Sequence, residues 1–237
     1  MHSFLERYLD GEHEQVWADL AALGAGVRSL DVLADAETAA YETMHRARDN
    51  VDELIVRPTA MGYTFGLPDG DAWIPHAPRQ APDENTPAYI RHLEILAGPL
   101  PLAIRAWYEV VGAVYLIGQA PWAETETLPD AVYVADTKVA LDDLLLWQED
   151  RAEDDEPFFL CLAPDEYHKA DISGGPEYAI RLPNSGADAL IENEWHGITF
   201  VAYLRECFAC GGFPGLAREP GGLPALYRQL AQGLKPL

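Results

Sequence analysis

The spacing of apolar residues changes partway along this chain, and the change restricts the fold more than any other feature of the sequence. Up to about residue 62 the pattern is helical, with apolar side chains at steps of three and four: Ala40, Met44, Ala47, Val51, Leu54 and Ile55. This spacing forms one apolar stripe along a helix, and the stripe must pack on another element. Beyond Gly112 the pattern becomes short β-branched or aromatic runs bounded by Gly, Pro or Asp, at 114–117, 132–134, 158–162 and 178–182. Such runs are typical of strands.

Further helices are expected on both sides of the long apolar stripe. The helical patterns occupy residues 4–9, 12–23, 88–96, 100–111, 139–148, 198–210 and 223–234. Strands and helices follow each other irregularly, without the steady alternation that builds a doubly wound parallel sheet. The sequence therefore predicts an α+β fold.

A proline-rich stretch divides the chain. Between Gly66 and Pro87, five prolines stand among Gly and Asp, and this composition argues against regular structure. We therefore expect an N-terminal helical extension at 1–66, a Pro-rich connection at 67–87 and an α+β domain at 88–237.

The charge balance limits the class of partner. The chain has 39 acidic and 16 basic side chains, a net charge of −23, and only three lysines, Lys138, Lys169 and Lys235. Direct nucleic-acid binding needs a Lys/Arg surface that neutralises phosphates, so we do not expect it. A basic partner protein would be attracted and steered in. Alternatively, the acidity serves only to keep the protein soluble, and the sequence leaves both interpretations open.

The sequence also bears on location. No run of about 18 apolar residues could span a bilayer, and the first residues carry acidic charge where a secretory signal needs a basic start. Three cysteines, Cys161, Cys207 and Cys210, are too few and too clustered for a disulfide framework. We expect a cytoplasmic protein that makes no contact with membranes.

Two stretches resemble the SUKH superfamily, which contains the Smi/Knr-type cell-wall assembly regulators and many bacterial toxin-immunity proteins. GPLPLAIRAWYEVVGAVYLIG, residues 98–118, is similar to the family's opening helix, which starts at a Leu-Pro pair and leads into the first strand. Here Val111-Gly112-Ala113 stands where the family has an Asn-Gly-Gly-like turn. FFLCLAPDEYHKADISGGPEYAIRLP, residues 158–183, resembles a later strand, glycine-containing turn and strand, and TFVAYLRECF resembles the C-terminal helix.

The resemblance implies a mixed β-sheet flanked by helices, with no catalytic centre and a surface used for binding a partner. Immunity members of the family bind and neutralise toxins. On this basis we expect residues 88–237 to form a SUKH-like domain that binds another protein, a basic toxin domain being one such partner. The oligomeric state does not follow from the sequence.

One predicted loop gathers side chains that could carry chemistry. Asp165, His168, Lys169, Asp171 and Ser173 precede Gly174-Gly175, and Trp195 and His196 follow later. Carboxylates and imidazoles can act as acid and base or bind a metal. Asp165 and His168 can equally hydrogen-bond the backbone of a turn, and we favour that interpretation. No nucleophile-elbow, phosphate-loop, HExxH, EF-hand or dinucleotide motif occurs, so we predict no catalytic residue, no metal and no cofactor.

The residues proposed for partner binding come from two segments. The first is the loop region, with Asp165, His168, Asp171, Trp195 and His196. The second is an acidic segment that includes Asp142, Asp143, Glu149 and Asp150 within a run of charge reaching Glu156. As a solvated helix end this segment would need no function.

The Cys207-Phe-Ala-Cys210 pair closes a predicted helix, where the helix dipole disfavours a thiolate, so we expect buried, inert cysteines. Two other functions remain as alternatives to partner neutralisation. One is a constitutive adaptor that docks through its N-terminal helices. The other is a metal-dependent enzyme that uses Asp165, His168 and His196.

Overall fold

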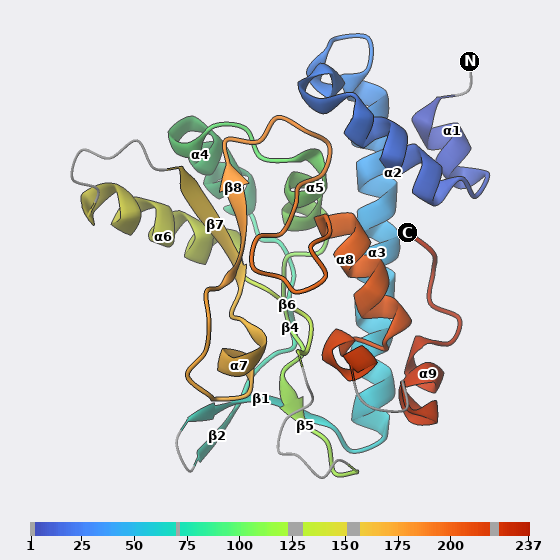
Figure 1. The fold of residues 1–237 in the computed structure, drawn as a ribbon, viewed down its shortest axis with the longest axis vertical. Helices are drawn as coiled ribbons and strands as arrows, with labels where there is room; N and C mark the ends of the chain where they lie inside the picture. The colour runs from blue at the N-terminus through green and yellow to red at the C-terminus, as the bar shows by residue number, and fades with distance from the viewer. Residues whose placement is uncertain (1–2, 70–71, 123–129, 151–156, 219–222) are drawn as a thin grey trace.

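A computed structural model describes residues 3–69, 72–122, 130–150, 157–218 and 223–237, and Figure 1 shows its fold. Its longest element is helix α3, Leu33–Ala60, which runs along the long axis of the molecule. The predicted apolar stripe of α3 is confirmed, because Ala40, Met44, Ala47, Val51 and Leu54 are at most 1% exposed. Pro58 lies in the last turn of α3, and the helix ends two residues later, at Ala60.

Three short elements precede α3 and pack against it. They are α1 (Phe4–Leu9), α2 (His13–Ala22) and the 3₁₀ helix η1 (Gly24–Arg28). Ser3 and Glu6 form a capping box at the start of α1, and the Asp35 carboxylate of α3 accepts hydrogen bonds from the amides of Phe4 and Leu5. The Trp17 indole of α2 donates a hydrogen bond of 3.1 Å to Thr43 of α3. These bonds hold the first helices on the long one.

The Pro-rich segment contains strands, contrary to the prediction from its composition. β1 (Thr64–Asp69) pairs antiparallel with β2 (Ala72–Pro75), and β3 (Arg79–Gln80) pairs with β4 (Ala113–Tyr115). β1 also pairs with β5 (Gly118–Gln119), but only through Thr64 and Phe65. At Pro68, β1 is therefore paired with β2 alone and has a free edge on its other side. Proline has no N–H to donate, and such an edge position tolerates it.

The α+β class is confirmed, although the expected mixed sheet is not what the strands form. β6 (Tyr133–Val134) joins β4 in a sheet of order β3-β4-β6, and β7 (Phe158–Ala163) pairs with β8 (Tyr178–Leu182). Every strand pairing among the described residues is antiparallel.

Helices cover these sheets and link them to α3. They are α4 (Thr86–Ala97), α5 (Leu102–Val110), α6 (Thr137–Asp150), α7 (Glu166–Lys169), α8 (Phe200–Ala209), η2 (Pro214–Arg218) and α9 (Ala225–Ala231). α5 packs on α3, α6 packs on α4 and β7, and α9 packs on α3 and α8. Trp107 of α5 meets Phe200 of α8 edge to face, with ring centroids 5.4 Å apart. Buried apolar side chains from Tyr8 to Leu237 form one cluster, so the N-terminal helices share their core with the rest.

No helix in the described part of the chain combines the length and the apolar character needed to cross a membrane.

Candidate functional site

Asp165 is bonded within its own loop. It caps the short helix α7, and its Oδ1 atom accepts hydrogen bonds from the His168 amide at 2.9 Å and from His168 Nδ1 at 2.6 Å. Its Oδ2 atom accepts the Gly175 amide at 2.5 Å. A Cβ atom on Gly174 would lie 2.5 Å from Oδ2, so the glycine allows this close approach. Partial burial raises the pKa of Asp165, but the hydrogen bonds from His168 and Gly175 outweigh it and hold the pKa below its usual value.

An ion pair that sequence reasoning missed lies beneath this loop. Lys169 Nζ is 2.5 Å from Asp130 Oδ1, and the two side chains are 1% and 0% exposed. The Lys169 ammonium also lies 4.7 Å from the centre of the Tyr178 ring. Among the described residues, Asp130 Oδ2 and the Tyr203 hydroxyl are buried without a hydrogen-bond partner. Asp130 and Lys169 are 39 residues apart, and no local pattern in the sequence connects them.

Trp195 and His196 belong to a second bonded group. The Glu194 side chain is fully buried, and its carboxylate contacts His196 Nδ1 at 2.5 Å and accepts the His196 amide at 2.9 Å. Trp195 stacks on His196, and the Arg218 guanidinium lies 3.9 Å from the centre of the Trp195 ring. Arg218 also pairs with both carboxylate oxygens of Glu166, the first residue of α7. Arg218 thus joins the two bonded groups, which together we call the loop cluster: residues 165–175, 194–196 and Arg218.

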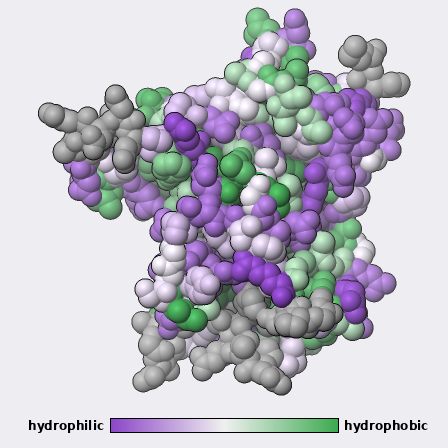
Figure 2. Space-filling model, in the orientation of Figure 1, coloured by the Kyte–Doolittle hydropathy of each residue, from purple (hydrophilic) through white to green (hydrophobic). Residues whose placement is uncertain are grey.

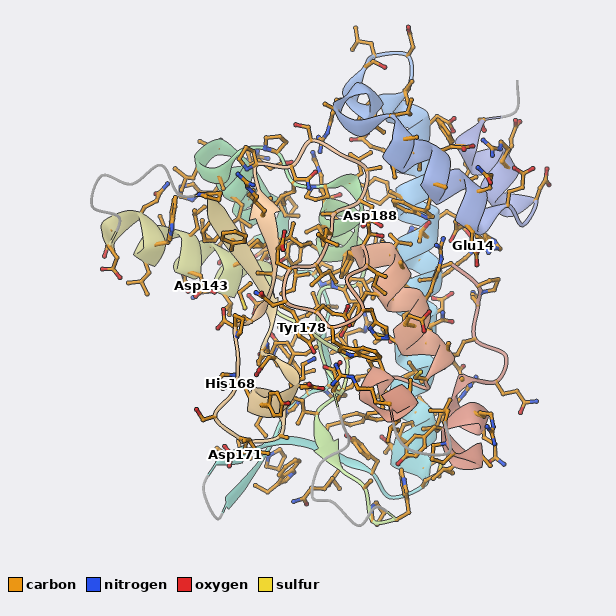
Figure 3. All side chains as sticks on the ribbon, viewed as in Figure 1. Glu14, Asp143, His168, Asp171, Tyr178 and Asp188 are labelled. Atoms are coloured by element: carbon orange, nitrogen blue, oxygen red, sulfur yellow. The ribbon has the colours of Figure 1, made fainter. Side chains whose placement is uncertain are left out.

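The acidic segment lies elsewhere. Figure 3 shows Asp143 on α6, well separated from His168 and Asp171 of the loop cluster. Asp171 is exposed and has a φ of +58°, a backbone conformation that aspartate tolerates in turns. The structure therefore divides the predicted partner-binding residues into two surfaces.

Helix α6 presents an acidic face that also carries apolar side chains. The exposed residues at helical spacing, which we call the α6 face, are Lys138, Val139, Asp142, Asp143, Leu145, Leu146, Glu149 and Asp150. Val139 is 43% exposed, Leu145 38% and Leu146 58%. Figure 2 shows hydrophobic and hydrophilic residues side by side over α6 at the left of the view. The rest of the acidic run, residues 151–156, lies outside the described residues.

The opposite side of α6 holds the helix in place. Ala140, Leu141 and Leu144 are buried where α6 packs on α4 and β7. The Trp147 ring lies beside the Phe158 ring, with ring centroids 5.5 Å apart. On the α6 face itself, Lys138 pairs with Asp142 at 2.6 Å. Partial burial raises the pKa of Asp143, and the negative Glu177 and Asp142 raise it further. The face thus concentrates negative charge that one lysine offsets only in part.

The cysteines lie in surroundings that disfavour thiolates. Cys207 and Cys210 are buried at the C-terminal end of α8, and burial raises the pKa of both thiols. Burial also raises the pKa of Cys161 in β7. Among the residues that the structure describes, no three His, Cys, Asp or Glu side chains are grouped so that they could hold a metal ion.

Comparison with known proteins gives no relative: no family model, no curated protein and no solved structure matches the chain.

Proposed function

We propose that this protein binds a basic protein partner through the α6 face. The observation that carries the proposal is the combination on one helix of four exposed carboxylates, those of Asp142, Asp143, Glu149 and Asp150, with exposed Val139, Leu145 and Leu146. A helix end that served only to keep charge in water would have no use for three large apolar side chains among the acids. Apolar groups supply contact area, and the carboxylates select a partner of opposite charge.

The two kinds of side chain would act at different stages of binding. The net charge of −23 and the carboxylates of the α6 face accelerate encounter with a basic surface, and this effect weakens when salt screens the charges. When the complex forms, Leu145, Leu146 and Val139 become buried away from water, and this burial slows dissociation. Raising the salt concentration should therefore lower the association rate more than it raises the dissociation rate.

The resemblance of residues 98–118 and 158–183 to the SUKH superfamily supports a more specific version of this proposal. α5 and β4 coincide with the first of these stretches, and β7, α7 and β8 with the second. In this version the protein is an immunity factor, and its partner is a basic toxin domain that it occludes. Inhibition of that toxin by the purified protein, at a ratio near one to one, is the measurement that supports the immunity role over an adaptor role.

We propose a binding role in preference to the alternative of a metal-dependent enzyme because the histidines that this alternative would use are engaged with neighbours. His168 contacts Asp165, and His196 contacts the buried Glu194. Elemental analysis of the purified protein and a hydrolase screen of wild type and His168→Ala test this choice. A bound metal together with an activity lost in His168→Ala would replace the binding proposal.

The binding proposal is tested by recovering proteins bound to wild type and to a charge-neutral variant. The variant carries Asp142→Asn, Asp143→Asn, Glu149→Gln and Asp150→Asn. The matched control carries Asp10→Asn, Asp31→Asn, Glu84→Gln and Glu206→Gln, four exposed carboxylates away from α6, so both variants have the same net charge.

We expect a stoichiometric partner at physiological salt with wild type and control, and loss of that partner with the α6 variant. A third variant, Leu146→Ala, should retain the association rate and dissociate faster. Equal recovery with both charge variants would show that only total charge matters and would overturn the role of the α6 face. Recovery of no specific partner by wild type would overturn the proposal as a whole.

A further inference from the structure

Helix α6 is held in place by its own cap and by its buried side. Asp136 Oδ1 accepts the amides of Lys138 and Val139 at 2.7 and 2.8 Å and so caps the first turn. Leu141 and Leu144 are buried on the inner side of the helix. Figure 1 shows α6 at one edge of the molecule, away from the long helix α3. Because α6 is already fixed, a partner does not have to order it on binding.

The exposed apolar side chains of α6 are spaced for contact with a second helix. Val139 is 43% exposed, and Leu146, seven positions later, is 58% exposed. Seven residues are close to two helical turns, so both side chains lie on one side of α6, roughly 10 Å apart along its axis. Apolar residues at this repeat are those with which helices pack along each other. Leu145 lies next to Leu146 and widens the apolar stripe.

Exposed carboxylates follow each of these apolar side chains. Asp142 and Asp143 lie three and four positions after Val139. A second pair, at 149–150, lies three and four positions after Leu146. Residues three and four positions apart are neighbours on the surface of a helix, so each apolar group has two carboxylates one turn further on. A complementary helix therefore carries Lys or Arg three or four positions from its own apolar residues.

We propose that the α6 face docks a basic amphipathic α-helix of the partner. The helix lies along α6 and places two apolar side chains, seven residues apart, on Val139 and Leu146. Its Lys or Arg side chains lie opposite the carboxylates. This inference rests on the proposed function and deepens it, because it names the element of the partner that the α6 face accepts.

The spacing on α6 selects a helix over an extended segment. Side chains on one face of a strand recur about every 6.7 Å, and no whole number of these steps gives the roughly 10 Å between Val139 and Leu146. Side chains three residues apart in a strand do span about 10 Å, but they point to opposite faces. A partner helix reproduces the spacing with residues seven positions apart.

The charge of the α6 face selects a basic partner over a second copy of this chain. Two α6 faces brought together would set four carboxylates of one copy against four of the other. The one cation of the face, Lys138, already pairs with Asp142 at 2.6 Å. Like charges placed face to face oppose association. We therefore expect analytical ultracentrifugation to show no dimer that depends on the face, and a dimer that Leu146→Ala disrupts would overturn the inference.

The probe is a fluorescein-labelled peptide with two leucines seven positions apart, lysine pairs three and four positions from each leucine on both sides, and alanine and glutamine elsewhere. A matched isomer has the same composition, with one leucine moved two positions to the far side of the helix. Fluorescence anisotropy follows the titration of each peptide with the full chain at physiological ionic strength. We expect a dissociation constant of roughly 10–100 µM for the probe and about tenfold weaker binding of the isomer. Equal binding of the two peptides would show that charge alone attracts them and would overturn the inference.

Variants of the protein test the docking geometry. Val139→Ala and Leu146→Ala should each weaken the probe about fivefold, and the charge-neutral α6 variant should weaken it about tenfold or more. Leu30→Ala, which truncates a leucine that is 96% exposed ahead of α3, and the matched charge control should each change the affinity by less than about twofold.

Double-mutant cycles between the protein and the probe test whether the two helices lie along each other. Val139→Ala should couple to one leucine of the probe and Leu146→Ala to the other. Coupling of both to the same leucine, or to neither, would contradict the proposed arrangement.

The partner recovered with wild type separates this inference from the proposed function. Hydrogen exchange of the complex identifies the segment of the partner that the α6 face protects, and a helix with the spacing described supports the inference. A protected strand or loop, with binding still lost in the charge-neutral α6 variant, would overturn the helix and leave the proposed function standing. Probe binding with the expected variant pattern, but with no partner recovered, would overturn the proposed function and support the helix preference of the α6 face.

Discussion

The loop cluster and the α6 face use similar carboxylates in opposite ways. In the loop cluster, Asp165 and Glu194 each accept backbone and imidazole hydrogen bonds, and beneath it Lys169 pairs with Asp130 out of contact with water. On the α6 face the carboxylates stand in water, and Lys138 and Asp142 form its one described ion pair. Charge that is satisfied internally stabilises a fold, whereas exposed charge beside apolar groups is available to a partner.

This difference separates stability from binding, two properties that acidic residues in a sequence do not distinguish. Substitutions in the loop cluster should change the free energy of unfolding, and substitutions on the α6 face should change binding with little effect on unfolding.

The largest effect is expected from Lys169→Met. The substitution leaves Asp130 buried without its cation, and breaking a buried pair in this way costs about 3–5 kcal/mol. Urea unfolding measures the change. Lys169→Met combined with Asp130→Asn removes both charges and should recover part of the loss, since asparagine tolerates the φ of +49° at position 130. A loss below about 1 kcal/mol in the single variant would show that the pair does not hold the loop cluster.

Asp165→Ala should destabilise the protein by about 1–2 kcal/mol at pH 7, because the cap of α7 and the bond to Gly175 are lost. Since the folded-state pKa of Asp165 lies below its usual value, the stability it adds is present above about pH 4 and is lost as the pH falls through the folded pKa. Urea unfolding of both proteins at pH 7 and at about pH 3 should show the difference shrinking in acid. A difference that is the same at both pH values would rule out the carboxylate as its source.

Arg218→Ala should cost about 0.5–1 kcal/mol, because the pair with Glu166 and the contact with Trp195 are partly exposed. Arg218→Lys keeps the charge but loses the planar stacking and the bidentate pairing, and should recover less than half of that loss. Partner binding through the α6 face should be unchanged in both variants. Weakened binding would show that the loop cluster belongs to the interface, contrary to the separation of stability from binding.

The smallest effect on unfolding is expected from Asp143→Asn. Its raised pKa means that the charged form is disfavoured in the folded state, so wild type gains stability as the pH falls through the folded pKa of Asp143, and neutralising the side chain removes that dependence. At pH 7 the free energy of unfolding should change by less than about 0.5 kcal/mol, in the stabilising direction. The association rate with a basic partner should fall in the same variant. Clear destabilisation by urea unfolding would show that Asp143 supports the fold instead.

Local patterns predicted the elements whose signals are local. α1 and β8 have the predicted bounds, and the stripe from Ala40 to Leu54 is buried as its spacing requires. The acidic segment was also identified from sequence, although not the apolar side chains exposed between its carboxylates. Whether Leu146 faces the core or water depends on what packs against α6, and a sequence does not state that.

Long-range pairing decided the rest. β3 lies in a segment whose prolines argue against strands, and it forms because β4, more than thirty residues later, supplies hydrogen-bond partners, whereas within the same segment β1 pairs with the neighbouring β2.

By itself the sequence determined the α+β class, the long helix, the excess of negative charge and the positions of its carboxylates. Only the tertiary structure decided which carboxylates are satisfied inside the protein and which face water. The physical reason is that hydrogen bonding and burial depend on neighbours in space. Asp130 and Lys169 are distant along the chain and in contact in the fold, whereas Asp143 and His168 are closer along the chain and separate in space.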